Sequence, residues 1–140
     1  MAEPPPPLGL ILLDGRYERV HYGLAMAASA LAVDRPVVLF FTNHALHALA
    51  IGAGWRRLLS DADGRTAAAQ DDARRAKGVA GLAELLEACA ALGGRFIACE
   101  MGLRTAGLRP DDLLPAPPVE VAGLVTFYDA LPAGAQPTVL

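Results

Sequence analysis

The amino-acid sequence predicts an α/β protein, a single-domain three-layer sandwich built on a mostly parallel sheet of four or five strands. Short apolar runs without alternation, such as 8–13 and 37–41, are typical of strands that helices cover on both faces. Stretches with helical spacing separate these runs, and strands that alternate with helices form parallel sheets. The chain has 140 residues, 54% of them hydrophobic, which suffices for one core.

We expect the domain to span residues 8–140, behind a proline-rich tail at 1–7. The start of the chain lacks the basic segment of a secretory signal, so we expect a cytoplasmic protein whose two cysteines are reduced. Apolar stretches such as 24–33 are too short to cross a bilayer, and we expect no membrane association. The net charge of −3 and the scattered basic residues give no reason to expect nucleic-acid binding.

The first half of the domain is expected to contain two strands and three helical segments. Val20 and Leu24 belong to a series with helical spacing, and Pro36 ends that helix. Thr42 or Asn43 is a candidate N-cap for the next helix. The expected ranges are 8–13 and 37–41 for strands, 18–33 and 44–49 for helices, and 55–59 for a helical turn.

Residues 61–78 differ from the rest of the chain, because they include no large apolar residue. This composition predicts a polar loop or a loosely held helix, longer than an ordinary connection. A mobile lid and an exposed insertion are both compatible with it, and the exposed insertion is the simpler hypothesis.

The second half begins with a clearly amphipathic helix. Leu82, Leu86 and Cys89 lie on its apolar face, and Gly93 and Gly94 end it. A proline-rich connection precedes the fourth strand. The expected ranges are 82–92, 100–106 and 124–131 for helices, 95–98 and 119–122 for strands, and 137–140 for an edge strand.

Ligands of open parallel sheets bind at the carboxyl ends of the strands. This rule selects four segments, which are 14–19, 42–47, 99–102 and the loop after Ala122. The sequence contains no dinucleotide fingerprint, P-loop, nucleophile elbow or Cys-x-x-Cys motif, and we expect no cofactor.

Cys99 is the strongest chemical candidate, because it lies where a strand gives way to a helix. The free N–H groups of the helix favour a thiolate, which is the reactive form of cysteine. Glu100 next to it opposes thiolate formation. A small buried apolar residue is the alternative role for Cys99, since free cysteine often packs in that way.

We expect Cys89 to be mainly a core residue, with an accessory role in the chemistry as the second hypothesis. It lies about 6 Å up its helix from the turn at Gly93, whereas Cys99 lies about 16 Å along the strand, in another layer. A disulfide needs Cα atoms closer than about 7 Å, so we expect no resting disulfide between them.

His44 and His47 are three residues apart and follow the second strand directly. Together with Cys99 they form a set of metal-capable residues, although histidine pairs of this kind are common on helices. A more modest role is that His21, His44 or His47 supplies a proton or a positive charge near the thiol.

Three segments, 78–89, 95–102 and 119–127, resemble the DsrE/DsrF-like family of sulfur-relay proteins. The opening strand and residues 37–42 also fit, so the resemblance covers most of the chain. Its most specific part is the segment Cys99, Glu100, Met101, Gly102 after a strand.

The resemblance implies a fold of the YchN-like type, assembled as homotrimers or hexamers. It implies that Cys99 accepts a sulfane sulfur as a persulfide and passes it to a partner protein, beside TusA-like carriers and rhodanese-type donors. Cys89 would match an accessory cysteine that some subgroups carry. We expect the pocket around Cys99 to be lined by residues of the three strand-to-helix loops, which are Tyr17, His21, Asn43, His44, Glu100, Met101 and Gly102.

Two other functions remain open from the sequence. The chain could be a non-catalytic oligomeric module that binds a ligand or partner, with both cysteines structural. A metal site built from His44, His47 and Cys99 is the weaker alternative.

Overall fold

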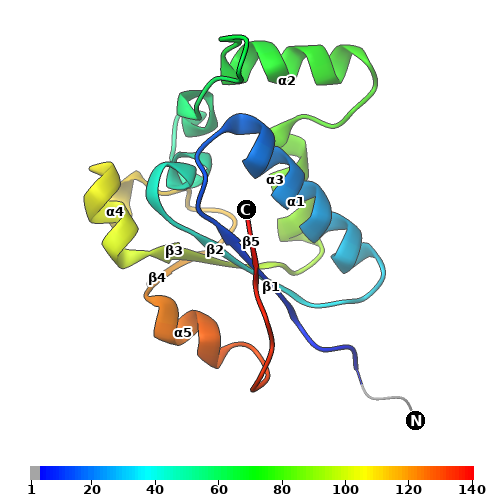
Figure 1. Ribbon diagram of the computed structural model, residues 1–140, viewed down its shortest axis with the longest axis vertical. Helices are drawn as coiled ribbons and strands as arrows, with labels where there is room; N and C mark the ends of the chain where they lie inside the picture. Colours follow the sequence, from blue (N-terminus) through cyan, green and yellow to red (C-terminus); the bar gives the residue numbers. More distant parts are fainter. Residues whose placement is uncertain (1–3) are drawn as a thin grey trace.

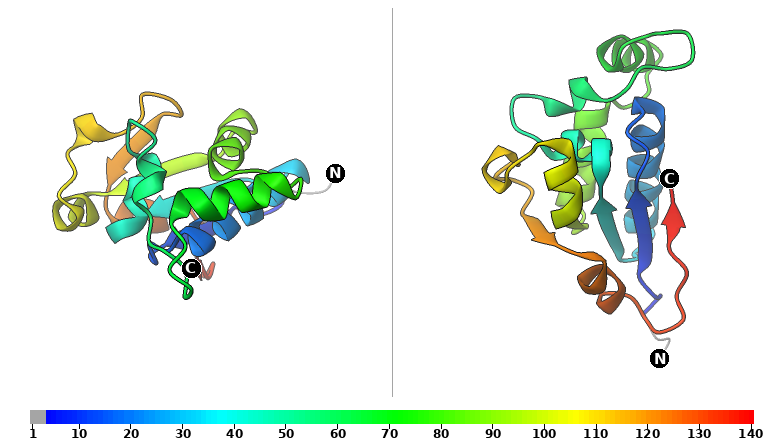
Figure 2. Two further views of the ribbon diagram at one scale, coloured as in Figure 1. Left: turned by 90° about the horizontal axis from the view of Figure 1, so that it is seen from above. Right: turned by 60° about the vertical axis from the view of Figure 1, so that its left-hand side comes forward.

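The computed structural model describes residues 4–140 and contains a five-stranded, fully parallel sheet (Figure 1). The strands are β1 (Leu8–Leu12), β2 (Val37–Phe41), β3 (Arg95–Cys99), β4 (Val119–Ala122) and β5 (Thr138–Val139). Their order across the sheet is β4-β3-β2-β1-β5. The arrows of β1, β2 and β5 point the same way in the right-hand view of Figure 2, and β3 and β4 pair in parallel with their neighbours, so the carboxyl ends of the strands lie at one edge.

Helices connect the strands and cover both faces. The α-helices are α1 (Tyr17–Ala32), α2 (Ala67–Ala76), α3 (Leu82–Ala91), α4 (Glu100–Ala106) and α5 (Leu124–Asp129). Three 3-10 helices lie between them: η1 (Asn43–Leu49), η2 (Gly54–Arg57) and η3 (Pro110–Asp112). The predicted fold class is therefore confirmed, and the predicted helix at 44–49 is a 3-10 helix.

The two faces of the sheet are covered very differently (Figure 1). α1 and α3 pack on one face, over the larger core, which includes Leu10, Leu39 and Phe96. The six-residue helix α5 packs on the other face, where Phe127 contributes to a smaller cluster of six buried residues. Because side chains alternate along a strand, neighbouring residues of β3 belong to different cores.

The segment 61–78 is not simply an exposed insertion, so that prediction is wrong for its central part. α2 occupies residues 67–76 and buries Ala67, Gln70 and Asp71. The carboxylate of Asp71, 3% exposed, accepts hydrogen bonds from the Tyr17 hydroxyl at 2.6 Å and from the Leu82 amide at 2.8 Å. One buried carboxylate thus ties α2 to the start of α1 and to the start of α3.

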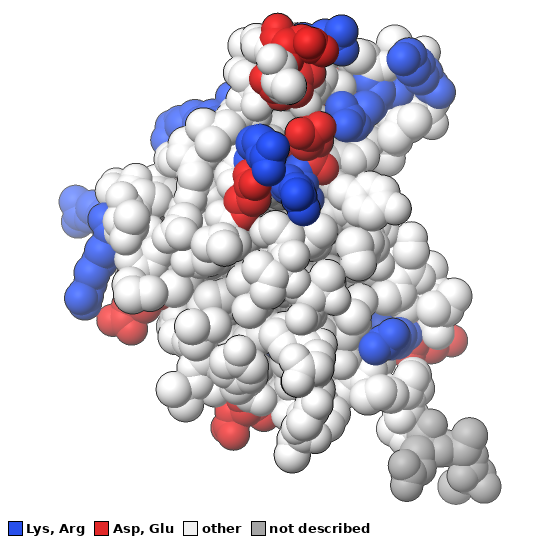
Figure 3. All heavy atoms as spheres, viewed as in Figure 1, with Lys and Arg blue, Asp and Glu red and all other residues white. Residues whose placement is uncertain are grey.

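Charged side chains gather over α2 at one end of the molecule, whereas the part of this face around α5 and β5 carries few charges (Figure 3). Residues 4–7 of the predicted tail form neither helix nor strand, and residues 1–3 lie outside the described part of the chain. Within residues 4–140, every helix is too short or too polar to cross a membrane.

Candidate functional site

Cys99 is the last residue of β3 and the N-cap of α4. Its side chain belongs to the cluster on the α5 face, together with Val38, Phe40 and Ile97. The backbone N–H of Gly102 donates a hydrogen bond to the Cys99 sulfur, over 3.3 Å. This bond holds the sulfur at the first turn of α4. The residue is 3% exposed, so the thiol is buried.

Gly102 allows α4 to approach the end of β2 closely. A Cβ atom on Gly102 would lie 2.6 Å from the Thr42 hydroxyl oxygen and 2.8 Å from the Asn43 nitrogen. Both distances are too short for real contacts, so only glycine fits without a shift of the backbone. This close approach brings the loops after β2 and β3 together beside the Cys99 sulfur.

Thr42 and Asn43 form the β2 side of this site. Thr42 is buried and is the N-cap residue of η1, as predicted, but its side chain makes no capping hydrogen bond. Asn43 is exposed and adopts a left-handed backbone conformation with φ of +49°, which asparagine tolerates better than most residues. The selected segment 42–47 contains Thr42, but the expected pocket residues include only Asn43 and His44 from it, although Thr42 continues the alternation of Val38 and Phe40 toward the Cys99 face.

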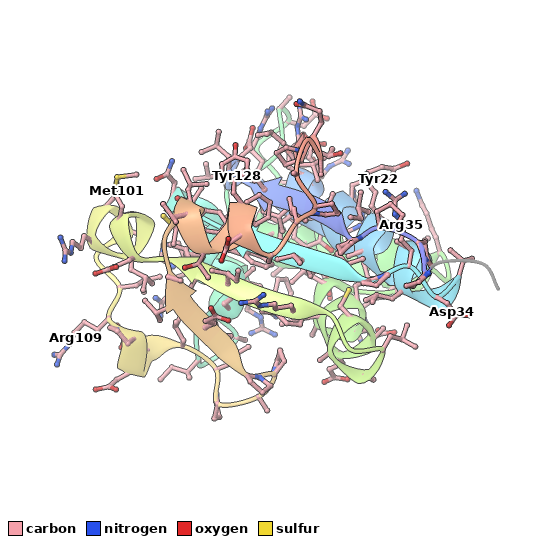
Figure 4. All side chains as sticks on the ribbon, turned by 90° about the horizontal axis from the view of Figure 1, so that it is seen from below. Tyr22, Asp34, Arg35, Met101, Arg109 and Tyr128 are labelled. Carbon is pink, nitrogen blue, oxygen red and sulfur yellow. The ribbon has the colours of Figure 1, made fainter. Side chains whose placement is uncertain are left out.

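Glu100 and Met101 point away from the thiol. The Glu100 carboxylate lies 3.5 Å from the Arg104 guanidinium, in an exposed ion pair one turn along α4. Met101 is 68% exposed (Figure 4).

The loop after β4 borders the site from the other side. Ala122 is paired with Cys99 across the parallel ladder, and Gly123 then begins α5. Phe127 of α5 is fully buried in the cluster that contains Cys99. Three of the four predicted strand-end segments therefore surround the thiol.

Cys89 has a different environment. It is fully buried among the residues packed under α1 and α3, and its thiol donates to the Leu24 carbonyl oxygen over 3.4 Å. Burial raises the pKa of this thiol to about 11. Both cysteines are buried free thiols in separate clusters on opposite faces of the sheet.

Tyr17 and His21 do not join Cys99, so their assignment to its pocket is wrong. Tyr17 is fully buried in the core on the α1 face and donates its hydroxyl proton to Asp71. The His21 ring packs on Tyr17, with its Nε2 2.9 Å from the carbonyl oxygen of Ala80. They follow β1, and the turn of α1 directs their side chains toward α2 and α3 instead of toward β3.

His44 and His47 lie against each other, with ring centres 4.5 Å apart. The Nε2–H of His44 donates to the Arg57 carbonyl oxygen over 2.7 Å, so this nitrogen is already engaged. Burial, together with the nearby His44 and Arg57, lowers the pKa of His47. Within residues 4–140, no three His, Cys, Asp or Glu side chains come close enough to hold a metal ion, so the set with Cys99 does not form.

The chain matches the model of the DsrE/DsrF-like family over residues 10–136. Its fold is similar to that of the protein of unknown function MTH1491 from Methanobacterium thermoautotrophicum, with a TM-score of 0.62 and 16% sequence identity. That similarity covers 96% of this chain and 98% of the other. No curated protein matches the chain.

Proposed function

Because the chain belongs to the DsrE/DsrF-like family, we propose that it is a sulfur-relay protein that carries a sulfane sulfur as a persulfide on Cys99. The observation that supports this assignment is the hydrogen bond from the Gly102 N–H to the Cys99 sulfur at the carboxyl edge of the sheet. This edge is where parallel sheets place their reactive groups. Cys89 lies on the opposite face of the sheet, away from this edge site.

The proposed reaction is an exchange at sulfur. The Cys99 thiolate attacks the outer sulfur of a donor persulfide, a new S–S bond forms at Cys99, and the S–S bond of the donor breaks. The inner sulfur of the donor leaves as a thiolate, so no external oxidant or reductant is consumed. The thiolate of an acceptor protein then attacks the outer sulfur on Cys99 and regenerates the free thiol.

Access to the sulfur is part of this proposal. Cys99 is 3% exposed, so a donor reaches it only after a local movement. α5 is the short element on that face, and its Val125 is 84% exposed. Few buried contacts hold this helix, because Phe127 is its one buried residue.

The proposal includes a homo-oligomer, a trimer or hexamer, working with a TusA-like carrier or a rhodanese-type donor in the cytoplasm. α5 exposes Leu124, Val125 and Tyr128 on the thinly covered face of the sheet. Figure 4 labels Tyr128 on this helix. Exposed apolar side chains grouped on one helix favour contact with another protein surface. A reducing compartment would keep both cysteines in the free-thiol form.

Exposure of the protein to polysulfide, or to thiosulfate with a rhodanese, followed by intact-mass spectrometry tests this function. The proposal predicts addition of sulfur to the wild type and to Cys89→Ser, and none to Cys99→Ser. Wild type without an adduct, or an undiminished adduct on Cys99→Ser, contradicts it.

The burial of Cys99 favours one other function, that of a non-catalytic oligomeric binding module with two structural cysteines. The rate of alkylation of folded protein by iodoacetamide separates the two. A sulfur carrier has a Cys99 that reacts within minutes in the native state. A binding module has a Cys99 that reacts only after unfolding in urea.

A further inference from the structure

A pocket of about 240 Å³ lies on the α3 side of the sheet, away from the cluster of Cys99. Its walls come from the end of η1, from η2, from α3 and from the segment after η3. The lining is apolar apart from one side chain, and its residues are Ala48, Ala50, Ala53, Trp55, Ala83, Leu86, Glu87, Leu114, Ala116 and Pro117. A cavity of about 150 Å³ accommodates benzene, so this space holds one ring with a short arm.

Backbone hydrogen bonds hold the walls in place. The N–H of Ile51 donates to Asp112 over 2.8 Å, and the N–H of Leu114 donates to Leu49 over 2.8 Å. These two bonds tie the end of η1 to the segment after η3. The N–H of Gly54 donates to Ala50 over 3.2 Å and fixes the approach to Trp55. The pocket is therefore preformed, which lowers the entropic cost of filling it.

Glu87 is the one charged residue in the lining. Its carboxylate is exposed, and within the described part of the chain it takes part in no ion pair. Arg56 lies over the Trp55 ring, with its guanidinium carbon 5.6 Å from the ring centre, and is not part of the lining. An apolar pocket with one free carboxylate is complementary to an apolar body that carries a positive charge.

We propose that this pocket binds a small organic amine, whose single ring or short alkyl body fills the alanine-lined space and whose ammonium group faces Glu87. This site lies on the opposite side of the sheet from Cys99 and does not depend on sulfur chemistry. The body of the ligand replaces water against Leu86 and Leu114, and the ammonium group remains at the mouth of the pocket, next to the carboxylate.

Trp55 is the single tryptophan of the chain, so its fluorescence reports on the pocket directly. The full-length protein is titrated with 2-phenylethylamine, with 3-phenylpropionate and with 2-phenylethanol. The amine is expected to give a saturable change, with an affinity about fivefold above that of the alcohol, as expected for one exposed ion pair. The carboxylate is expected to bind most weakly.

Two variants and two matched controls complete the test. Glu87→Gln is expected to remove the preference for the amine, whereas Glu84→Gln, an exposed glutamate of the same helix outside the lining, keeps it. Ala83→Phe is expected to fill the pocket from an exposed position and abolish binding, whereas Ala91→Phe leaves it intact. Equal binding of amine and carboxylate, the absence of a saturable change, or binding that survives Ala83→Phe overturns the proposal.

Discussion

The amide nitrogen of Gly102 lies 3.3 Å from the sulfur of Cys99 and donates a hydrogen bond to it. The glycine is fixed in this place by the end of β2, because Thr42 and Asn43 leave no room for a side chain on it. The thiol is therefore positioned by two loops that are more than fifty residues apart in the sequence. This relationship leads to the first prediction.

Gly102→Ala is expected to destabilise the protein by about 1–3 kcal/mol, because its Cβ would lie 2.6 Å from the Thr42 hydroxyl oxygen. The shift of α4 that relieves the clash also lengthens the bond to the Cys99 sulfur, so sulfur loading should slow. Urea denaturation and the rate of persulfide formation measure the two effects. Gly123→Ala is the control, since a Cβ there meets no atom within 4 Å. Equal stability of the two variants would refute the packing argument.

The Tyr17 hydroxyl is expected to contribute about 1–2 kcal/mol to stability. Tyr17→Phe removes one of the two hydrogen bonds that Oδ1 of the buried Asp71 carboxylate accepts, and the bond from the Leu82 amide remains. Tyr22→Phe removes a hydroxyl from a side chain that is 65% exposed and should change the free energy of unfolding by less than about 0.5 kcal/mol. Thermal and urea unfolding of both variants measure the difference, and equal effects would mean that Asp71 does not anchor α2.

Stability should fall at alkaline pH through Cys89. Burial raises the pKa of its thiol to about 11, so the folded state holds the proton more tightly than the unfolded state does. The stability that the protonated Cys89 thiol contributes is fully present below the pKa of the unfolded thiol and is lost as the pH rises toward 11. Its size is on the order of 3 kcal/mol, at about 1.4 kcal/mol for each tenfold change in acidity.

The free energy of unfolding, measured from about pH 8 to pH 11, tests this sign. Cys89→Ala should flatten the decline relative to the wild type, and Cys99→Ala serves as the matched control. Tyr17, whose pKa is raised by burial and by its bond to Asp71, adds to the decline at still higher pH. A profile that Cys89→Ala leaves unchanged would contradict the assignment.

The α5 surface is expected to form the contact between copies of the chain. Val125→Glu places a charge on a side chain that is 84% exposed, so the fold of one protomer should tolerate it while an oligomer should dissociate. Val33→Glu is the control, because Val33 is 73% exposed at the far end of α1. Light scattering after size exclusion gives the mass. If the wild type is a monomer, or if an oligomer persists in Val125→Glu, then α5 does not form the contact between copies.

Much of the fold follows from local patterns. Val37 to Phe41 is an uninterrupted apolar run because both faces of β2 are covered, and this pattern identified the buried strands. Cys99 at the end of such a run was placed at the sheet edge for the same reason. These features depend on neighbours in the sequence, which is why one sequence suffices to predict them.

Features that depend on which face a side chain occupies were harder to predict. Tyr17 and His21 follow a strand end just as Asn43 does, yet α1 directs them into the opposite core. Asp71 is buried because it binds partners 54 and 11 residues away in the sequence. The polar composition of segment 61–78 therefore gave no sign that one of its carboxylates anchors α2. Alternation from Phe40 to Thr42 is the one local signal that could have identified a missed site residue.

The position of the transferred sulfur tests the central claim most directly. Trypsin cleaves after Lys77, Arg95 and Arg104, so Cys89 and Cys99 fall in separate peptides, 78–95 and 96–104. After loading with polysulfide and alkylation, peptide mass spectrometry should find the additional sulfur on 96–104 in the wild type and in Cys89→Ser. It should also disappear when an acceptor thiol is added. Sulfur on 78–95, or none on 96–104, would contradict the assignment of Cys99 as the carrier.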